Sequence, residues 1–203
     1  VDIGLFRASP KLFSEQPKLT YGTRGMDPFR GFPQFIKALP EVLNEIDIEI
    51  EIAGNPSTFY GNPPKNFKNW KDWAINYLDS ENLKGKVTWK GFMQFEEYRK
   101  WLQSSWCHVY LTHPFVVSWS FVEALSANAP IITSDIEATK EFGQNQEGIV
   151  YVDHREPSEI SQAIKSQFAF SPPNVDRYDK IKKYDVSESR RKWGVALGLE
   201  LST

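Results

Sequence analysis

The chain has 203 residues and a formal net charge of −2, and its 40% hydrophobic, 14% aromatic and 25% charged residues are typical of one fairly large globular domain. The low charge argues against a surface for nucleic acid or an acidic membrane, the single Cys107 excludes an internal disulfide, and no apolar stretch is long enough to cross a bilayer. We therefore expect a soluble cytoplasmic domain that binds no nucleic acid and has no transmembrane segment, and we interpret Val1 as a cut or processed start.

Strands and helices are predicted to alternate along the chain. Residues 1–17 contain Pro10 and Pro17 and are predicted to be an irregular lead-in, with the domain over 18–203. Short β-branched runs predict strands at 18–23, 46–53, 86–90, 107–112, 130–134 and 148–152. Apolar residues at helical spacing predict helices at 32–45, 70–78, 94–105, 120–127, 137–142 and 157–168. Pro40 is expected to kink or split the first helix, and the charged tail 174–203 is expected to be helical with a break near Tyr184 and Asp185.

This alternation predicts an α/β fold, a Rossmann-like doubly wound parallel sheet of about six strands with helices on both faces. In open sheets of this kind, ligands bind beyond the carboxyl ends of the strands. The candidate loops are therefore 24–31, 54–68, 91–94, 112–119 and 135–140. The Pro-, Asn- and Gly-rich loop 55–68 is long for a compact domain, which indicates a functional role.

Several standard site motifs are absent from the sequence. There is no Walker loop, no GxGxxG fingerprint and no GxSxG nucleophile turn. The three histidines, His108, His113 and His154, are scattered and do not have metal-ligand spacing. A histidine in a strand is more often structural than catalytic, so we expect no metal site.

Two segments carry chemical information, and the first is TYGTRGMDPFRGF, which leaves a strand and enters a helix. It contains Arg24 and Arg30. Two guanidinium groups and the amides of a helix start, near the carboxyl end of a strand, suit a diphosphate. The alternative is that both arginines are solvated or paired with Asp27, and the segment alone leaves both interpretations open.

The second segment is HVYLTHPFVVSWSFVEALSANAPIITSD, which is predicted to be a strand, a loop, a short helix and a strand. Glu123 stands alone as an acid within a long apolar and hydroxylated run. Its carboxylate could accept hydrogen bonds from vicinal hydroxyls such as those of a nucleotide ribose. However, Ser120 followed three residues later by Glu123 also fits a capping box, and a buried carboxylate could do both.

The ordered set of segments YGTRGMDPFRG, WKGFM, FVVSWSFVEALSANAPIITSD and GIVYVD resembles the C-terminal half of the family 4 glycosyltransferases. The opening VDIGLF also resembles the hinge between the two lobes of those enzymes, so the match spans most of residues 1–168. The resemblance implies one lobe of a GT-B fold, the donor-binding lobe. Residues 1–17 would then be the interdomain hinge, and the acceptor-binding N-terminal lobe would lie outside this chain.

The resemblance also implies roles for individual residues. Arg24 matches the arginine of the family's first motif and Arg30 its lysine, and both would face the donor diphosphate. Glu123 matches the second glutamate of the family's pair, which holds the ribose hydroxyls. The turn that faces the nucleotide base would be Gly91, Phe92 and Met93.

The sequence departs from the family pattern in the loop before Glu123. Phe115 stands where the first glutamate would contact the donor sugar, and Val116 and Ser118 replace glycines. β-branched residues resist positive φ, so this loop is not expected to copy the glycine-loop backbone. Ser118 and Ser120 could instead offer hydroxyl groups to the donor diphosphate. Catalytic residues stay unassigned.

The function implied is binding of a nucleotide-diphosphate sugar for retaining transfer, without metal or other cofactor. The acceptor would be a glycan or lipid-linked glycan held by the missing lobe, which could also place the enzyme peripherally at the inner face of a membrane. The fragment alone is expected to be inactive. The alternative is a non-catalytic α/β nucleotide-binding or protein-interaction module, for which Phe115 is the best support. Most of the tryptophans are expected in helix packing, with Trp119 as the exception.

Overall fold

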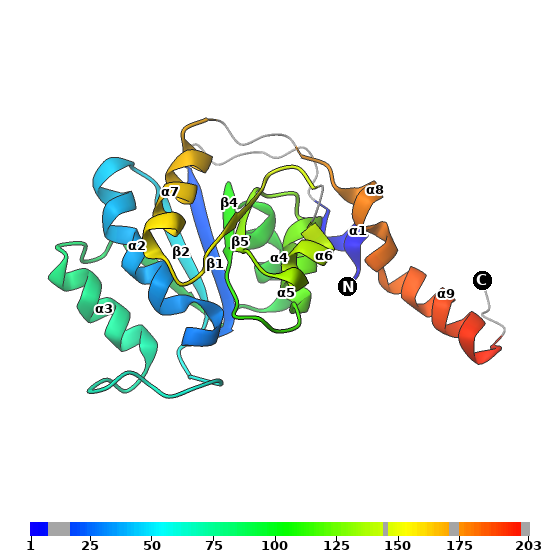
Figure 1. Ribbon diagram of the computed structural model, residues 1–203, viewed down its shortest axis with the longest axis horizontal. Helices are drawn as coiled ribbons and strands as arrows, with labels where there is room; N and C mark the ends of the chain where they lie inside the picture. Colours follow the sequence, from blue (N-terminus) through cyan, green and yellow to red (C-terminus); the bar gives the residue numbers. More distant parts are fainter. Residues whose placement is uncertain (8–16, 144–145, 171–174, 200–203) are drawn as a thin grey trace.

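Six strands form one parallel sheet in the order β3-β2-β1-β4-β5-β6 (Figure 1). The computed structural model describes residues 1–7, 17–143, 146–170 and 175–199. The strands are β1 (Lys18–Gly25), β2 (Glu49–Asn55), β3 (Val87–Gly91), β4 (Cys107–Tyr110), β5 (Ile131–Ser134) and β6 (Ile149–Val152). Successive strands run outward from β1 to one edge, and the chain then returns to place β4 on the other side of β1. This is the doubly wound arrangement predicted from the sequence, with its switch point between β1 and β4.

Helices cover both faces of the sheet and enclose two apolar cores (Figure 1). One face is covered by α2 (Phe32–Glu45), α3 (Trp70–Ser80) and α7 (Pro157–Phe168). The other is covered by α1 (Ile3–Phe6), α4 (Phe95–Gln103), α5 (Trp119–Ser126) and α8 (Tyr178–Ile181). The remaining elements are η1 (Pro28–Arg30), α6 (Glu137–Gly143), η2 (Lys182–Tyr184) and α9 (Val186–Leu197). Because side chains alternate along a strand, neighbouring residues of β4 face different cores, with Val109 in the first and Tyr110 in the second.

Pro40 was expected to kink or split helix α2, and because this helix runs through Pro40 without interruption, the expectation of a split is wrong. Proline removes one backbone hydrogen bond. Buried apolar side chains on both sides of it, including Ile36, Leu39 and Val42, hold the two halves of the helix against the same core. Tertiary packing therefore outweighs the local penalty.

The start of the chain is helical where the sequence predicted an irregular lead-in. Ile3 and Phe6 of α1 are buried in the second core, and the Ile3 amide donates to Asp185 Oδ2 at 2.9 Å. The Val186 amide donates to the carbonyl of Val1 at 2.9 Å, so the first residues of the chain lie against the start of α9. Asp185 also caps α9, which confirms the break expected near this residue. The rest of the lead-in, residues 8–16, falls outside the described residues.

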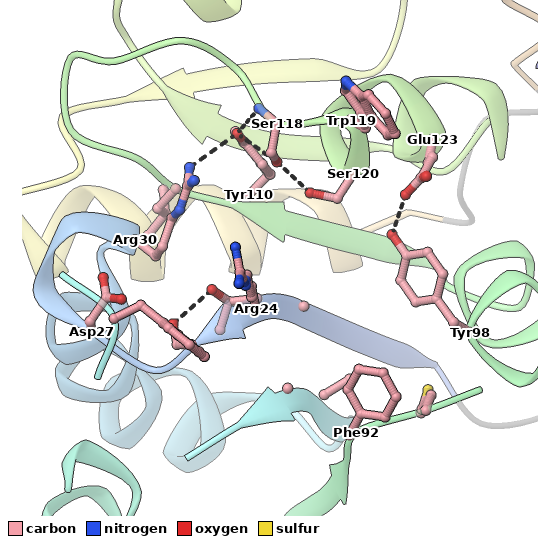
Figure 2. Close-up of a pocket in the computed structure, with 18 of the residues that line it drawn as sticks. Arg24, Asp27, Arg30, Phe92, Tyr98, Tyr110, Ser118, Trp119, Ser120 and Glu123 are labelled. Carbon is pink, nitrogen blue, oxygen red and sulfur yellow. Dashed lines mark hydrogen bonds between the residues drawn. The ribbon is translucent and has the colours of Figure 1, made fainter. Parts of the chain in front are cut away.

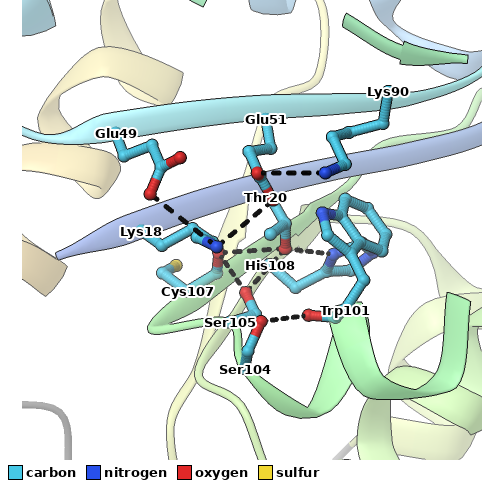
Figure 3. A network of polar contacts seen from close by, with 10 residues as sticks. All are labelled: Lys18, Thr20, Glu49, Glu51, Lys90, Trp101, Ser104, Ser105, Cys107 and His108. Atoms are coloured by element: carbon cyan, nitrogen blue, oxygen red, sulfur yellow. Dashed lines mark hydrogen bonds and ion pairs between the residues drawn. The ribbon is translucent and has the colours of Figure 1, made fainter. Parts of the chain in front are cut away.

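Polar contacts link the four strands β1, β2, β3 and β4 (Figure 3). Thr20 Oγ1 lies 2.6 Å from Ser105 Oγ and 2.8 Å from His108 Nδ1. The buried carboxylate of Glu51 lies between the ammonium groups of Lys18 and Lys90, at 3.4 and 3.6 Å. His108 is thus part of the packing of the sheet, as predicted for a histidine within a strand.

Candidate functional site

A cavity of about 650 Å³ lies at the carboxyl ends of β1, β2, β3 and β4 and at the start of α5 (Figure 2). This volume is in the range of small-molecule sites. The cavity is lined by all eight residues for which the sequence predicted a binding role: Arg24, Arg30, Gly91, Phe92, Met93, Ser118, Ser120 and Glu123. Four of the five candidate loops contribute to it, whereas 135–140 contributes no lining residue among those described.

Arg30 is fixed at one end of the cavity by both its backbone and its side chain. Its Nη1 donates to Thr112 Oγ1 at 3.1 Å and to Tyr110 Oη at 3.4 Å, and its carbonyl accepts from the buried hydroxyl of Tyr21 at 2.6 Å. Gly31 turns the chain into α2 with a φ of +62°, and a Cβ there would lie 2.6 Å from that of Leu111. Glycine is therefore required for the first loop to approach β4 this closely.

Arg24 lies at the end of β1 against the long loop 55–68. Its guanidinium carbon is 4.8 Å from the centre of the Phe59 ring, a cation–π contact. A Cβ at Gly25 would lie 2.2 Å from Phe59, so the two loops are in close contact. Phe59 and Tyr60 both line the cavity, in keeping with the role predicted for this loop.

Asp27 does not neutralise the two arginines. It is buried, and no ion pair joins it to Arg24 or Arg30 within the described part of the chain. Burial raises the pKa of Asp27, while the backbone amides of Tyr60, Arg30 and Phe59 and the charge of Arg30 act in the opposite direction. The carboxyl group thus faces the amides of loop 55–68, and the guanidinium groups keep donors for an anion.

Glu123 lies at the other end of the cavity and is held by Tyr98 of α4, whose hydroxyl donates to Glu123 Oε2 at 3.0 Å (Figure 2). Helix α5 begins at Trp119, with Ser118 as its N-cap residue and no side-chain cap, so the capping-box interpretation is wrong. Burial raises the pKa of Glu123, and the bond from Tyr98 opposes that shift. The pKa of Tyr98 is raised well above its usual value by burial and by the Glu123 charge, so Tyr98 keeps its proton and remains a donor. Tyr98 was not predicted as a site residue, because its helical spacing indicated core packing.

Three hydroxyl groups line the wall between these two ends. The Ser118 amide and Ser118 Oγ lie 2.9 and 3.1 Å from Tyr110 Oη, and Ser118 Oγ lies 2.5 Å from Ser120 Oγ. Tyr110 was not predicted as a site residue, because it occurs in an apolar strand. No pattern in the sequence shows that its hydroxyl reaches Arg30 and the start of α5.

The turn after β3 forms the floor of the cavity. Gly91 has a φ of +69°, Phe92 is 79% exposed and Met93 is buried in the second core. Gly54 of β2 has a φ of +138°, and a Cβ there would lie 2.0 Å from the Thr23 carbonyl oxygen of β1. This floor is built of backbone and apolar side chains, which suits a flat ring that is bound through backbone groups.

Two exposed aromatic residues flank the start of α5. Trp119 is 78% exposed and lines the cavity, unlike the buried Trp101, so the exception predicted for Trp119 agrees with its position. Phe115, which stands in place of an expected acid, is exposed and does not line the cavity. The loop that carries Phe115 therefore offers this cavity no carboxylate.

Two of the histidines that appeared scattered in the sequence are in contact. The ring centroids of His113 and His154 are 4.6 Å apart. Even so, the described ranges contain no group of three or more His, Cys, Asp or Glu side chains that could hold a metal ion. Among those same residues, no helix has both the length and the apolar character needed to cross a membrane.

Comparisons with known proteins give one matching family and several similar folds. The family model of the glycosyl transferases group 1 matches residues 17–169. No curated protein matches the chain. Among solved structures, HepE from Anabaena in complex with UDP and glucose has a TM-score of 0.75 at 15% identity, over 98% of this chain and 55% of that one. The C-terminal domain of the group 1 family protein LpcC from Francisella tularensis has a TM-score of 0.74 at 16% identity, over 92% of this chain and 99% of that domain.

Sucrose-phosphate synthase from Thermosynechococcus elongatus is also similar, with a TM-score of 0.67 at 16% identity over 97% of this chain and 51% of that enzyme. At such identities the likeness shows the fold alone. The chain spans about half the length of the HepE and synthase structures, and nearly the whole of the separate LpcC domain.

Proposed function

The chain belongs to the glycosyl transferases group 1 family, and from that premise we propose that it is the donor-binding lobe of a family 4, retaining glycosyltransferase. The observation that carries the proposal is that the predicted binding residues line one cavity. It has two arginines at one end, Glu123 at the other and the turn after β3 as its floor. A nucleoside diphosphate carries the complementary groups in the same order, namely phosphates, ribose hydroxyls and a flat base. HepE was crystallised with UDP, which supports UDP as the first nucleotide to test.

The chemistry that this lobe supplies is electrostatic. Arg24 and Arg30 would stabilise the negative charge that develops on the departing diphosphate, without metal or other cofactor. The acceptor, a glycan or lipid-linked glycan, would be held by a second lobe, since the chain spans only about half of HepE. We therefore expect the isolated chain to bind the donor nucleotide without turning over a sugar donor.

Titration calorimetry with UDP, GDP and ADP tests the proposal. We expect saturable binding of one of the three, and in Glu123→Ala a loss of affinity of about tenfold or more, because hydrogen bonds to a charged group contribute about 1.5–3 kcal/mol. Glu188→Ala is the matched control, because Glu188 is in α9 and, in the part of the chain that the structure describes, forms ion pairs only with Arg191 and Lys192. It should bind like the wild type.

A specific outcome would favour the alternative of a non-catalytic interaction module. The absence of saturable binding of all three nucleotides at millimolar concentration would contradict the donor site. The position of Phe115 outside the cavity would then support an interaction surface in place of a sugar subsite.

The pKa of Glu123 gives the nucleotide affinity a predictable pH dependence. Burial raises this pKa, so the carboxylate becomes protonated at a higher pH than an exposed glutamate and loses strength as an acceptor. Affinity is expected to fall as the pH decreases through this range. Because the pKa of Glu123 is higher in the folded state than in the unfolded chain, protonation of Glu123 stabilises the folded state. The loss of nucleotide affinity at lower pH is therefore not caused by unfolding linked to Glu123.

Glu123→Gln separates this effect from titration of the nucleotide phosphates. Glutamine keeps the shape of the side chain and carries no charge at any pH. The ratio of wild-type to variant affinity, measured from pH 7.5 downward, is expected to shrink. A constant ratio would show that the charge of Glu123 plays no part in binding.

A further inference from the structure

Tyr110, Ser118 and Ser120 form a chain of hydroxyl groups beside Arg30 (Figure 2). Tyr110 stands at the end of β4 and the two serines at the start of α5, and all three line the cavity. Each hydroxyl carries a single proton, so it can donate only one hydrogen bond while accepting others. The direction of donation along the chain therefore decides which hydroxyl can serve a ligand.

The hydroxyl groups donate their hydrogen bonds in the direction of Tyr110, from Ser120 to Ser118 and from Ser118 to Tyr110. The Ser118 amide and the Arg30 guanidinium can only donate, and both lie within hydrogen-bond distance of Tyr110 Oη, at 2.9 and 3.4 Å. Ser118 Oγ also donates to Tyr110 Oη at 3.1 Å. Because this uses the single hydroxyl proton of Ser118, the 2.5 Å contact between the two serines must be made by the proton of Ser120.

Tyr110 Oη thus accepts from the Ser118 amide and from Ser118 Oγ, which occupy its two lone pairs, and the Arg30 guanidinium makes a longer contact at 3.4 Å. The hydroxyl proton of Tyr110 finds no acceptor among the described residues. Tyr110 as a residue is 3% exposed, and its ring is held against Phe121 with centroids 4.8 Å apart, so the position of the hydroxyl is fixed. Donors on a hydroxyl oxygen, one of them cationic, also polarise the O–H bond and strengthen it as a donor.

We infer that Tyr110 donates its hydroxyl proton in a hydrogen bond to a diphosphate oxygen of the bound nucleotide. The inference rests on the proposed donor site and assigns the roles of the three hydroxyls within it. Phosphate oxygens only accept hydrogen bonds. A diphosphate bound at Arg30 can therefore accept one from the neighbouring Tyr110 hydroxyl. Ser118 and Ser120, whose protons are already used, act by orienting Tyr110. The contact is noncovalent and moves no proton between atoms.

Tyr110→Phe tests this assignment. The substitution keeps the ring against Phe121 and removes only the hydroxyl. We expect the affinity for UDP to fall about tenfold, while the affinity for uridine, which lacks phosphate, stays within about twofold. If the wild type binds GDP or ADP in place of UDP, the same comparison is made with that nucleoside diphosphate and its nucleoside. Tyr77→Phe is the matched control, since Tyr77 stacks on Trp73 of α3 away from the cavity, and its UDP affinity should equal that of the wild type.

Ser120→Ala determines the direction of the chain even if Tyr110→Phe does not fold. If the protons run toward Tyr110, the loss of UDP affinity in Ser120→Ala stays within about threefold. A tenfold loss would mean that the protons run toward Ser120, which would overturn the assignment. Unchanged or tighter UDP binding by folded Tyr110→Phe would overturn it as well, because Tyr110 would then only occupy donors that the ligand needs. If the wild type binds UDP but Tyr110→Phe or Ser120→Ala gives one of these contrary results, the role of Tyr110 is refuted while the proposed donor site is retained.

Discussion

Replacing Arg30 by alanine is expected to weaken binding of the nucleoside diphosphate about a hundredfold. The side chain is half-buried and fixed by Thr112 and Tyr110, so its guanidinium is already oriented when the ligand arrives. Loss of one partner of a hydrogen-bonded, partly desolvated charge pair costs about 2–5 kcal/mol. Among the substitutions considered for this site, we expect this one to have the largest effect on affinity.

Calorimetric titration with UDP measures this effect, with Arg191→Ala as the matched control. Arg191 is in α9 and pairs only with Glu188 among the described residues, so its removal should leave the affinity unchanged. Arg30→Lys keeps the charge but loses the planar fork, and should give an intermediate affinity. A loss of less than threefold in Arg30→Ala would show that the diphosphate lies elsewhere.

Replacing Arg177 by alanine is expected to lower the free energy of unfolding by about 3–5 kcal/mol. Arg177 is 1% exposed. Its Nη1 donates to the Ala129 carbonyl at 3.0 Å and its Nε to the Glu147 carbonyl at 2.9 Å, while its amide donates to Asn128 Oδ1 at 3.0 Å. Burial lowers the pKa of Arg177 to about 10, so it is still charged at neutral pH. Alanine would leave a cavity and two carbonyl groups without their donors.

Urea unfolding monitored by tryptophan fluorescence gives the magnitude. Arg177→Met fills most of the volume without restoring the hydrogen bonds, so it should lose less stability than Arg177→Ala. Arg191→Ala, an exposed arginine, should stay within about 0.5 kcal/mol of the wild type. An equally small change in Arg177→Ala would contradict a structural role for the buried guanidinium.

Most of the architecture could be predicted from local patterns in the sequence. Short strand-like runs and apolar residues at helical spacing alternate along the chain, so a doubly wound parallel sheet of about six strands could be predicted, whereas the order of the strands comes from the structure. Pro40 shows where local rules fail, because packing on both sides of it outweighs one lost hydrogen bond. Arg177 shows the same limit, since the sequence placed it only in a charged helical tail.

The candidate site was predictable where it depends on residue type and strand ends. Arg24 and Arg30 come from one segment at the end of β1 and Glu123 from helix α5, and the carboxyl ends of parallel strands bring them into one cavity. Tyr98 and Tyr110 could not be predicted, because an aromatic residue at core spacing reveals nothing about where its hydroxyl points. The capping box failed because α5 begins at Trp119, one residue before the predicted start.

The position of β1 at the centre of the sheet sets the order in which these parts can form. Leu19, Thr20 and Tyr21 of β1 pair with Cys107, His108 and Val109 of β4, and the chain between them forms the whole of β2, β3 and their helices. The floor of the cavity comes from the β2 and β3 side of this β1–β4 pairing, and Ser118 and Ser120 come from the β4 side. Closing so long a loop is slow compared with forming local helices. A folding chain would therefore acquire its helices early and its nucleotide site only when the two halves of the sheet join, so binding would stabilise the completed fold and no partly folded form.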